Sequence, residues 1–174
     1  MSNLRDDTAV RLVSIPGAHD AATGTVNLAG TSCQNMNIND LFDAGVRYFD
    51  FRVGFTAGTE LRMYHGPIDV SRTFKGVMND LYKKLEDHPK EFVIVEVTIE
   101  SATNQKSNAA DHLTNYFRHN YDKPEEDVYY TYWDCQSDYE AAKAKWLYFR
   151  PELTVEEARG HMILLFNDKY CREE

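Results

Sequence analysis

Residues 92–100 read Phe92-Val93-Ile94-Val95-Glu96-Val97-Thr98-Ile99-Glu100, and this stretch decides the fold. It is nearly continuous in β-branched residues, as expected for a parallel strand that is covered on both faces. Before it, apolar residues recur at helical spacing from Phe74 to Leu85, and the pattern stops before His88-Pro89. A helix that leads into a buried strand favours an α/β fold.

Further elements are predicted on both sides of this unit. Four more strands are expected, at residues 12–15, 46–52, 61–65 and 162–166. Three more helices are expected: one capped by Asn37 that buries Ile38, Leu41 and Phe42, one around Leu113, Tyr116 and Phe117, and one with a capping box at 154–157. Residues 122–152 are irregular and rich in aromatic side chains, and no element is predicted there.

Alternating strands and helices indicate a mostly parallel sheet of the (β/α) barrel kind. A complete eight-stranded barrel typically needs ~250 residues, whereas this chain has 174 and five predicted strands. No internal repeat or linker divides it. The sequence therefore predicts a single domain over residues 1–174, corresponding to the N-terminal half of a TIM-like barrel.

Composition excludes several classes of protein. With 19 basic and 28 acidic residues the net charge is −9, which argues against a nucleic-acid partner. No apolar run is long enough for a transmembrane helix, and the polar start MSNLRDD lacks the apolar core of a signal peptide. Cys33, Cys135 and Cys171 lie far apart without a CxxC pair, so a zinc knuckle is not expected and we predict three reduced thiols.

Polar residues gather where the first three predicted strands end. His19 and Asp20 follow the first strand, Asp50 and Arg52 close the second, and His65 closes the third. Ligands of parallel α/β folds bind at the carboxyl ends of the strands. Two imidazoles can exchange protons with an attacking and a leaving oxygen, while a guanidinium holds phosphate oxygens, so phosphoryl transfer is indicated. Taken singly, each histidine could be a surface residue, and the aspartate–arginine pair could be purely structural.

Together these residues form an ordered set of motifs. The motifs are Ser14-Ile15-Pro16-Gly17-Ala18-His19-Asp20, Gly45-Val46-Arg47-Tyr48-Phe49-Asp50-Phe51-Arg52, Tyr64-His65-Gly66-Pro67, His88-Pro89-Lys90-Glu91-Phe92-Val93-Ile94-Val95, and Arg159-Gly160-His161-Met162-Ile163-Leu164-Leu165. The chain resembles phosphatidylinositol-specific phospholipase C, in particular the X region of the bacterial type. The resemblance runs from about Asn3 to Phe166 and is weakest between Asn120 and Pro151.

The resemblance implies a mechanism. His19 would be the general base on the inositol 2-hydroxyl, which attacks the adjacent phosphorus, and His65 would protonate the departing diacylglycerol oxygen. Arg52 would bind a phosphate oxygen, with Asp50 holding Arg52 and Asp20 orienting His65. The products would be diacylglycerol and inositol 1,2-cyclic phosphate, which water opens in a slower step. No metal or cofactor is expected, because Arg52 takes the place of calcium in the metal-independent branch.

The chain also departs from the family pattern. Thr98 stands about where relatives carry Lys or Glu, with Glu100 on the same face, and Asn167 stands where bacterial relatives have Arg. We treat Thr98, Glu100 and Asn167 as candidate substrate contacts. The carboxylate that pairs with the base histidine in the family comes from late in the barrel, beyond the end of this chain.

Several interpretations therefore stay open. The chain can be part of a longer barrel, a half completed by a second copy, or a degenerate domain that binds lipids or inositol phosphates without turnover. A glycerophosphodiesterase-like barrel is a further alternative, although Arg52 argues against its acidic metal site. The substrate implies a phospholipid surface as partner and, by the family resemblance, secretion. Tyr129, Tyr130, Tyr132 and Trp133 would suit a membrane interface or internal packing.

Overall fold

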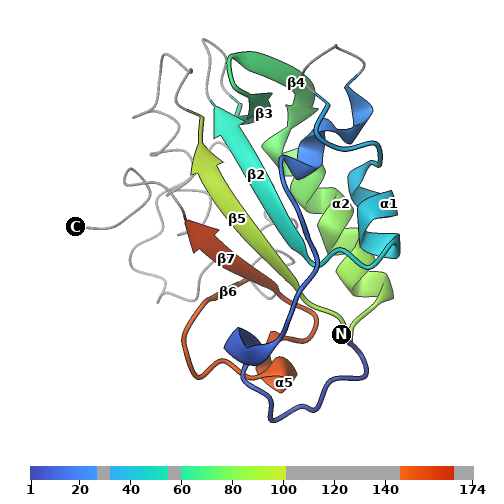
Figure 1. Cartoon of the computed structure of the whole chain (residues 1–174), viewed down its shortest axis with the longest axis vertical. Coiled ribbons are helices and arrows are strands. Elements are labelled where there is room, and N and C mark those ends of the chain that lie inside the picture. Colours follow the sequence, from blue (N-terminus) through green and yellow to red (C-terminus); the bar gives the residue numbers. More distant parts are fainter. Residues whose placement is uncertain (27–31, 55–59, 101–145, 167–174) are drawn as a thin grey trace, which may run out of the picture.

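A computed structural model describes residues 1–26, 32–54, 60–100 and 146–166, and it is built on one mixed β-sheet (Figure 1). The sheet has seven strands in the order β4-β3-β2-β5-β7-β6, with β1 paired to β2. Strand bounds are β1 Gly17–Ala18, β2 Tyr48–Gly54, β3 Arg62–His65, β4 Ile68–Thr73, β5 Val93–Ile99, β6 Trp146–Tyr148 and β7 Met162–Phe166. In the described part of the chain the sheet stays open, with β4 and β6 at its edges.

Helices α1 (Ile38–Asp43) and α2 (Phe74–Asp87) cover one face of this sheet (Figure 1). Alternate residues of β2 and β5 point into this layer and are almost wholly buried: Phe49, Phe51, Val53, Val93, Val95, Val97 and Ile99. Helix α1 begins at the predicted cap, Asn37, which accepts a hydrogen bond from the amide of Asp40. Helix α2 begins at Thr73, a cap that was not predicted, which accepts one from the amide of Gly76. The predictions of these two helices and of the strand at 92–100 are confirmed.

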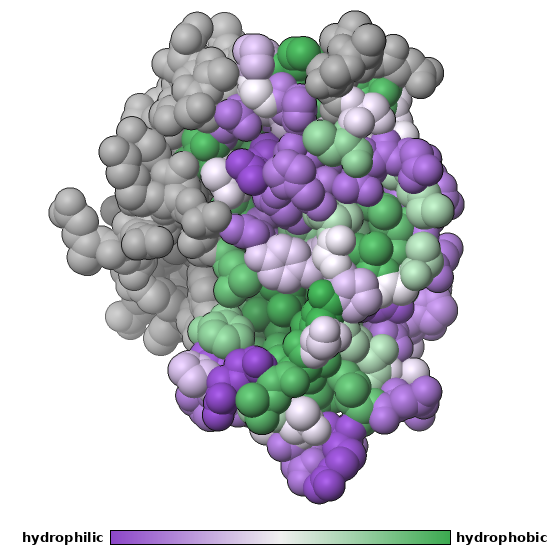
Figure 2. Space-filling model, in the orientation of Figure 1, coloured by the Kyte–Doolittle hydropathy of each residue, from purple (hydrophilic) through white to green (hydrophobic). Residues whose placement is uncertain are grey.

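The opposite face of the sheet is divided between an apolar end and a polar end. At the amino ends of the strands, Ile94 and Ile163 pack against the 3-10 helix η1 (Val10–Leu12) and helix α5 (Val155–Ala158). Toward the carboxyl ends, the same face carries Asp50, Arg52 and Thr98. Figure 2 shows hydrophobic residues gathered on the lower part of the visible face and hydrophilic residues above them. The polar end of this face is where a site can form.

The first predicted strand is wrong. Residues 10–12 form a 3-10 helix, and strand β1 covers only Gly17–Ala18. Val10, Val13 and Ile15 pack in the hydrophobic cluster around Ile94 and Ile163, whereas Leu12 is exposed. Pairing with β2 begins at Pro16, whose carbonyl accepts the amides of Arg47 and Tyr48. Proline has no amide to donate, but its carbonyl can still start a ladder.

The sheet is also less parallel than predicted. Strand β4 was not predicted, and it forms an antiparallel hairpin with β3, which in turn runs antiparallel to β2. Gly66, at φ +58, supplies the left-handed turn residue of this hairpin. Strand β6 falls in the stretch for which no element was predicted, and it pairs parallel to β7.

The short helix and strand near the end of the described chain are confirmed. The capping box of α5 joins Thr154 and Glu157 reciprocally, and β7 pairs parallel to β5. The predicted helix around Leu113 and the aromatic group 129–133 lie outside the described residues. None of the helices in the described ranges is long and apolar enough to cross a membrane.

Glu91 connects the first residues of the chain to the amino end of the sheet. It is only 8% exposed, and its carboxylate accepts hydrogen bonds from the Met1 ammonium, the Ser2 amide and the Arg47 guanidinium. Burial alone would raise the pKa of Glu91, but these donors outweigh it and lower the pKa to about 2. Ionised Glu91 therefore stabilises the folded chain.

The depressed pKa predicts a defined pH dependence of stability. A group whose folded pKa lies below its unfolded value of 4.5 contributes fully above that value and loses its contribution as the pH falls toward 2. Glu91→Gln should lower the free energy of unfolding by roughly 1–3 kcal/mol at pH 7 and by much less near pH 2. Urea denaturation at both pH values measures this difference.

The exposed Glu156→Gln serves as the control, and its effect should be small at both pH values. An equal loss of stability in Glu91→Gln at pH 7 and near pH 2 would contradict the electrostatic role of Glu91.

Candidate active site

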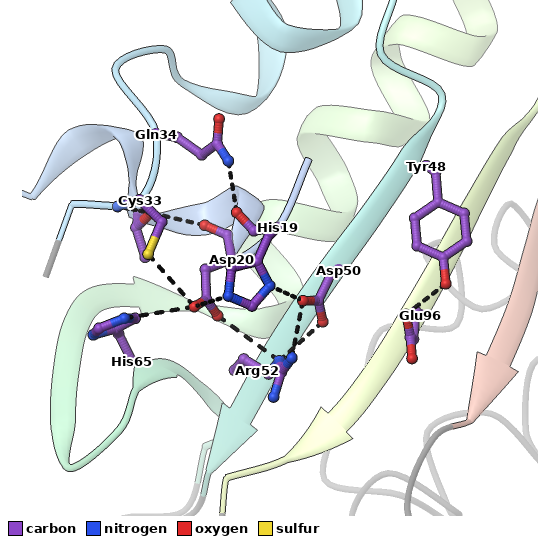
Figure 3. Close-up of polar contacts among 10 residues, drawn as sticks. His19, Asp20, Cys33, Gln34, Tyr48, Asp50, Arg52, His65 and Glu96 are labelled. Atoms are coloured by element: carbon purple, nitrogen blue, oxygen red, sulfur yellow. Dashed lines mark hydrogen bonds and ion pairs between the residues drawn. The ribbon is translucent and has the colours of Figure 1, made fainter. Parts of the chain in front are cut away.

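The polar end of the sheet gathers all five residues predicted to be catalytic (Figure 3). His19 and Asp20 directly follow β1, and the parallel register Ala18↔Phe49 sets His19 level with Asp50 on β2. Asp50 and Arg52 are two residues apart on one strand, so their side chains share a face. Asp20 has φ 46, in the left-handed region that aspartate tolerates better than most residues. This turn lets the consecutive residues His19 and Asp20 both face the group around Asp50 and Arg52.

Asp50 is a buried carboxylate that serves two partners at once. Its Oδ2 lies 2.6 Å from Nδ1 of His19, and its two oxygens accept from Nε and Nη2 of Arg52 at 2.9 and 3.1 Å. The carboxylate therefore fixes the imidazole and the guanidinium relative to each other. A neutral His19 that donates from Nδ1 keeps the lone pair on Nε2, which is the form a general base needs.

Asp20 is the second carboxylate of the site and is 6% exposed. Its Oδ2 lies 3.1 Å from Nε2 of His19 and 3.6 Å from Nε2 of His65. Its Oδ1 lies 3.8 Å from Nε of Arg52 and accepts no hydrogen bond from the described residues. Asp20 thus stands between the two histidines (Figure 3).

His65 reaches the site by a different route from the one predicted. The sequence suggested the carboxyl end of a parallel strand, but β3 runs antiparallel to β2 with the register Val53↔Met63. The β3–β4 hairpin closes just beyond His65 and brings its ring to the far side of Asp20 from Arg52 (Figure 3). The imidazole is 29% exposed, whereas that of His19 is 63% exposed, so both rings can be reached from solvent.

The charge of Arg52 is reinforced by its surroundings. Hydrogen bonding to Asp50 raises the pKa of Arg52 above its ordinary value, and the nearby carboxylates of Asp20 and Glu100 add to this despite partial burial. Within the described residues its hydrogen bonds go to Asp50 from Nε and Nη2, which leaves Nη1 for an anionic ligand. A fixed positive charge is therefore available at the carboxyl end of β2.

Two of the three candidate substrate contacts, Thr98 and Glu100, lie in the described part of the chain. The register Arg52↔Thr98 sets Thr98 beside Arg52, and its hydroxyl is buried without a hydrogen-bond partner among the described residues. Glu100 lies close enough to influence the charge of Arg52. Asn167 lies outside the described residues. The substrate-binding roles of these three residues stay predictions.

Three polar contacts near the site were missed by sequence reasoning. Gln34 donates to the carbonyl of His19 at 2.6 Å, and the thiol of Cys33 lies 3.6 Å from Oδ2 of Asp20. Although Cys33 is exposed as a residue, partial desolvation of its thiol and the adjacent Asp20 raise the pKa of that thiol, so it stays protonated and donates. Tyr48 donates to Glu96 across the sheet, and burial together with this carboxylate raises the pKa of Tyr48. Only this last pair could have been found from the sequence, because strand alternation places Tyr48 and Glu96 on the same face as Asp50 and Thr98.

One group of side chains in the described ranges has the spacing of metal ligands. One ligand atom each from His19, Asp20 and Cys33 lie within 4.8 Å of one another. A site for calcium would instead be built from carboxylate and carbonyl oxygens, and here Arg52 occupies the space beside Asp20 and Asp50.

Comparison with known proteins gives a consistent result. Residues 15–141 match the family "Phosphatidylinositol-specific phospholipase C, X domain". A curated 1-phosphatidylinositol phosphodiesterase from Listeria monocytogenes is 34% identical over 110 residues, which are 60% of this chain and 33% of that protein. One from Staphylococcus aureus is 25% identical over 101 residues, which are 56% of this chain and 32% of that protein.

Solved structures agree with this match. The phosphatidylinositol-specific phospholipase C from Listeria monocytogenes has a TM-score of 0.64 at 26% identity and covers 97% of this chain and 56% of its own. A Staphylococcus aureus structure has a TM-score of 0.69 at 19% identity, with 96% and 51% covered, and supports the fold alone. The predicted fold, part of a TIM-like barrel, is confirmed, and the chain spans about half the length of these structures.

The geometry predicts the tautomer of His19. Oδ2 of Asp50 lies 2.6 Å from Nδ1, nearer than Oδ2 of Asp20 at 3.1 Å from Nε2, so the neutral ring should carry its proton on Nδ1, whereas Nε2–H is the usual preference of free histidine. Two-dimensional nitrogen–proton NMR of the ring distinguishes the two forms, with His19→Gln used to assign the signal. A neutral ring protonated on Nε2 would contradict the role given to Asp50.

Proposed function

The chain belongs to the X-domain family of phosphatidylinositol-specific phospholipase C, and we propose that it cleaves phosphatidylinositol to diacylglycerol and inositol 1,2-cyclic phosphate. The observation that carries this proposal is the joint placement of two accessible histidines, two buried carboxylates and an arginine at one end of the sheet. A phosphodiester needs an acid, a base and a positive charge, and these residues offer all three.

In the proposed first step, His19 acts as the base. Its Nε2 takes the proton of the inositol 2-hydroxyl as that oxygen attacks the adjacent phosphorus. Asp50 holds the ring through Nδ1 at 2.6 Å and stabilises the imidazolium that forms. Asp50 thus supplies within this chain the carboxylate that the family resemblance places later in the barrel.

Arg52 stabilises the charge that develops on the phosphate. Its two bonds to Asp50 fix the plane of the guanidinium, so Nη1 is oriented before the substrate arrives. Preorganised donors of this kind cost little reorganisation during the reaction. Asp50 therefore couples the position of the base to the position of the phosphate ligand.

His65 completes the reaction as the acid. It gives a proton to the diacylglycerol oxygen as the bond between that oxygen and phosphorus breaks, and the 2-hydroxyl oxygen forms the new ester bond. Oδ2 of Asp20 lies 3.6 Å from Nε2 of His65 and orients the ring for this transfer. Return of the proton from His19, directly or through water, restores both histidines.

No metal is required by this scheme, since Arg52 supplies the positive charge. The alternative is a domain that binds lipid or inositol phosphate without turnover. The membrane partner and secretion are also proposals from the family resemblance. With a net charge of −9, we expect the chain to approach zwitterionic more readily than anionic surfaces.

Turnover of phosphatidylinositol vesicles tests this function. Phosphorus NMR should detect a cyclic phosphate that forms equally with and without EDTA. His19→Ala and His65→Ala should each lower the rate by at least about 100-fold, as expected when an acid or base is removed.

The exposed His88→Ala is the matched control and should keep the wild-type rate. Wild-type turnover in either site variant would contradict the proposed roles. Saturable binding of vesicles by a folded chain that gives no product would favour the binding domain instead.

A second prediction concerns Arg52. Arg52→Lys keeps the charge but loses the planar pair of bonds to Asp50, so it should lower kcat by about 10–1000-fold with a smaller effect on KM. Arg72→Lys, on the β4–α2 side of the molecule, is the control, because Arg72 pairs with Asp80 away from the site. Equal kcat values for Arg52→Lys and wild type would show that a positive charge alone suffices.

A further inference from the structure

The proposed mechanism makes no use of Cys33, although its thiol points into the site (Figure 3). Cys33 is exposed and uncrosslinked, and its Sγ lies 3.6 Å from Oδ2 of Asp20. The same oxygen lies 3.1 Å from Nε2 of His19. One nitrogen, one oxygen and one sulfur atom therefore converge from a loop and the residues that follow β1.

We propose that His19, Asp20 and Cys33 form a site for a thiophilic divalent cation of the Zn²⁺ class. Zinc binds nitrogen and oxygen at about 2.0–2.2 Å and sulfur at about 2.3 Å, so tetrahedral ligand atoms lie roughly 3.4–3.6 Å apart. Oδ2 of Asp20 lies 3.1 Å from Nε2 of His19 and 3.6 Å from Sγ of Cys33, close to this requirement, and all three ligand atoms lie within 4.8 Å of one another. A small movement of the exposed Cys33 side chain closes the set.

The surroundings of these ligands fit a metal as well. Zinc-bound histidines commonly donate their other ring nitrogen to a carboxylate, and Asp50 accepts from Nδ1 of His19 at 2.6 Å. Asp20 is 94% buried by side chain, and its Oδ1 lies 3.8 Å from Nε of Arg52 without a hydrogen bond from the described residues. Oδ2 is therefore the oxygen that would face the cation.

Binding at this site displaces one proton. The thiol proton now directed at Asp20 leaves as the metal–sulfur bond forms, and His19 uses the Nε2 lone pair that the proposed base requires. The cation would therefore inhibit rather than assist the reaction. This inhibitory consequence rests on the function proposed above, whereas the binding itself does not.

Metal binding by the whole folded chain provides the first test. Co²⁺ is the spectroscopic probe, because a thiolate ligand gives a charge-transfer band in the near ultraviolet. We expect one Co²⁺ per chain with this band in wild type and in the variant C135S/C171S, which keeps only Cys33. Cys33→Ser should lose the band and bind Zn²⁺ at least about tenfold more weakly.

The outcomes separate the site from other cysteines. A band that persists in Cys33→Ser at unchanged Zn²⁺ affinity would overturn the proposal, as would no binding by wild type. If C135S/C171S does not fold, the single variants Cys135→Ser and Cys171→Ser take its place. Asp20→Asn should weaken Zn²⁺ binding in the Cys33-containing chain, which a site elsewhere would not show.

Inhibition is measured separately, relative to the metal-free rate of each variant. Zn²⁺ should inhibit wild type, and Cys33→Ser should need at least about tenfold more Zn²⁺ for the same fractional loss. Zn²⁺ binding that requires Cys33 but leaves turnover unchanged would overturn the inhibitory part alone. Absence of turnover in every chain would contradict the proposed function and leave the binding result intact.

Discussion

The buried carboxylate of Asp50 is the constraint on which the site depends. It accepts from Nδ1 of His19 and from two nitrogens of Arg52. Because one rigid group holds both partners, the proposed base and the proposed phosphate ligand share a single reference point. Asp20 adds a second buried charge between His19 and His65. The two carboxylates join His19, Arg52 and His65 into one network.

Two apolar layers stabilise the fold, so the chain can carry the buried charges of this network. Helices α1 and α2 bury one face of the sheet, and the cluster around Ile94 and Ile163 fills the amino end of the other. The remaining carboxyl end can then carry charge while the apolar layers supply stability. The same strands, β2 and β5, contribute to both the core and the site by alternating their side chains. Alternate residues of these two strands therefore stabilise the core on one face and form the site on the other.

Sequence reasoning succeeded where one local pattern decided the structure. The β-branched run at 92–100, the helical spacing at 74–85 and the caps at Asn37 and Thr154 each predict their own element. It failed where distant pairing decides. Residues 12–15 look like a strand, but Val13 and Ile15 pack in the cluster around Ile94 and Ile163, and β4 becomes a strand only through pairing with β3. The five polar residues were identified by motif, whereas the bond from His19 to Asp50 and the approach of Cys33 depend on the register of β1 and a loop.

The central claim is that Asp50 acts through His19 and Arg52 together, and a double-mutant cycle on turnover tests it most directly. The account predicts that Asp50→Asn and Arg52→Lys each lower kcat strongly, while the double variant loses much less than the product of the two effects. Losses that multiply would show that the two residues act independently and would contradict the account. Unchanged kcat in Asp50→Asn would contradict it as well.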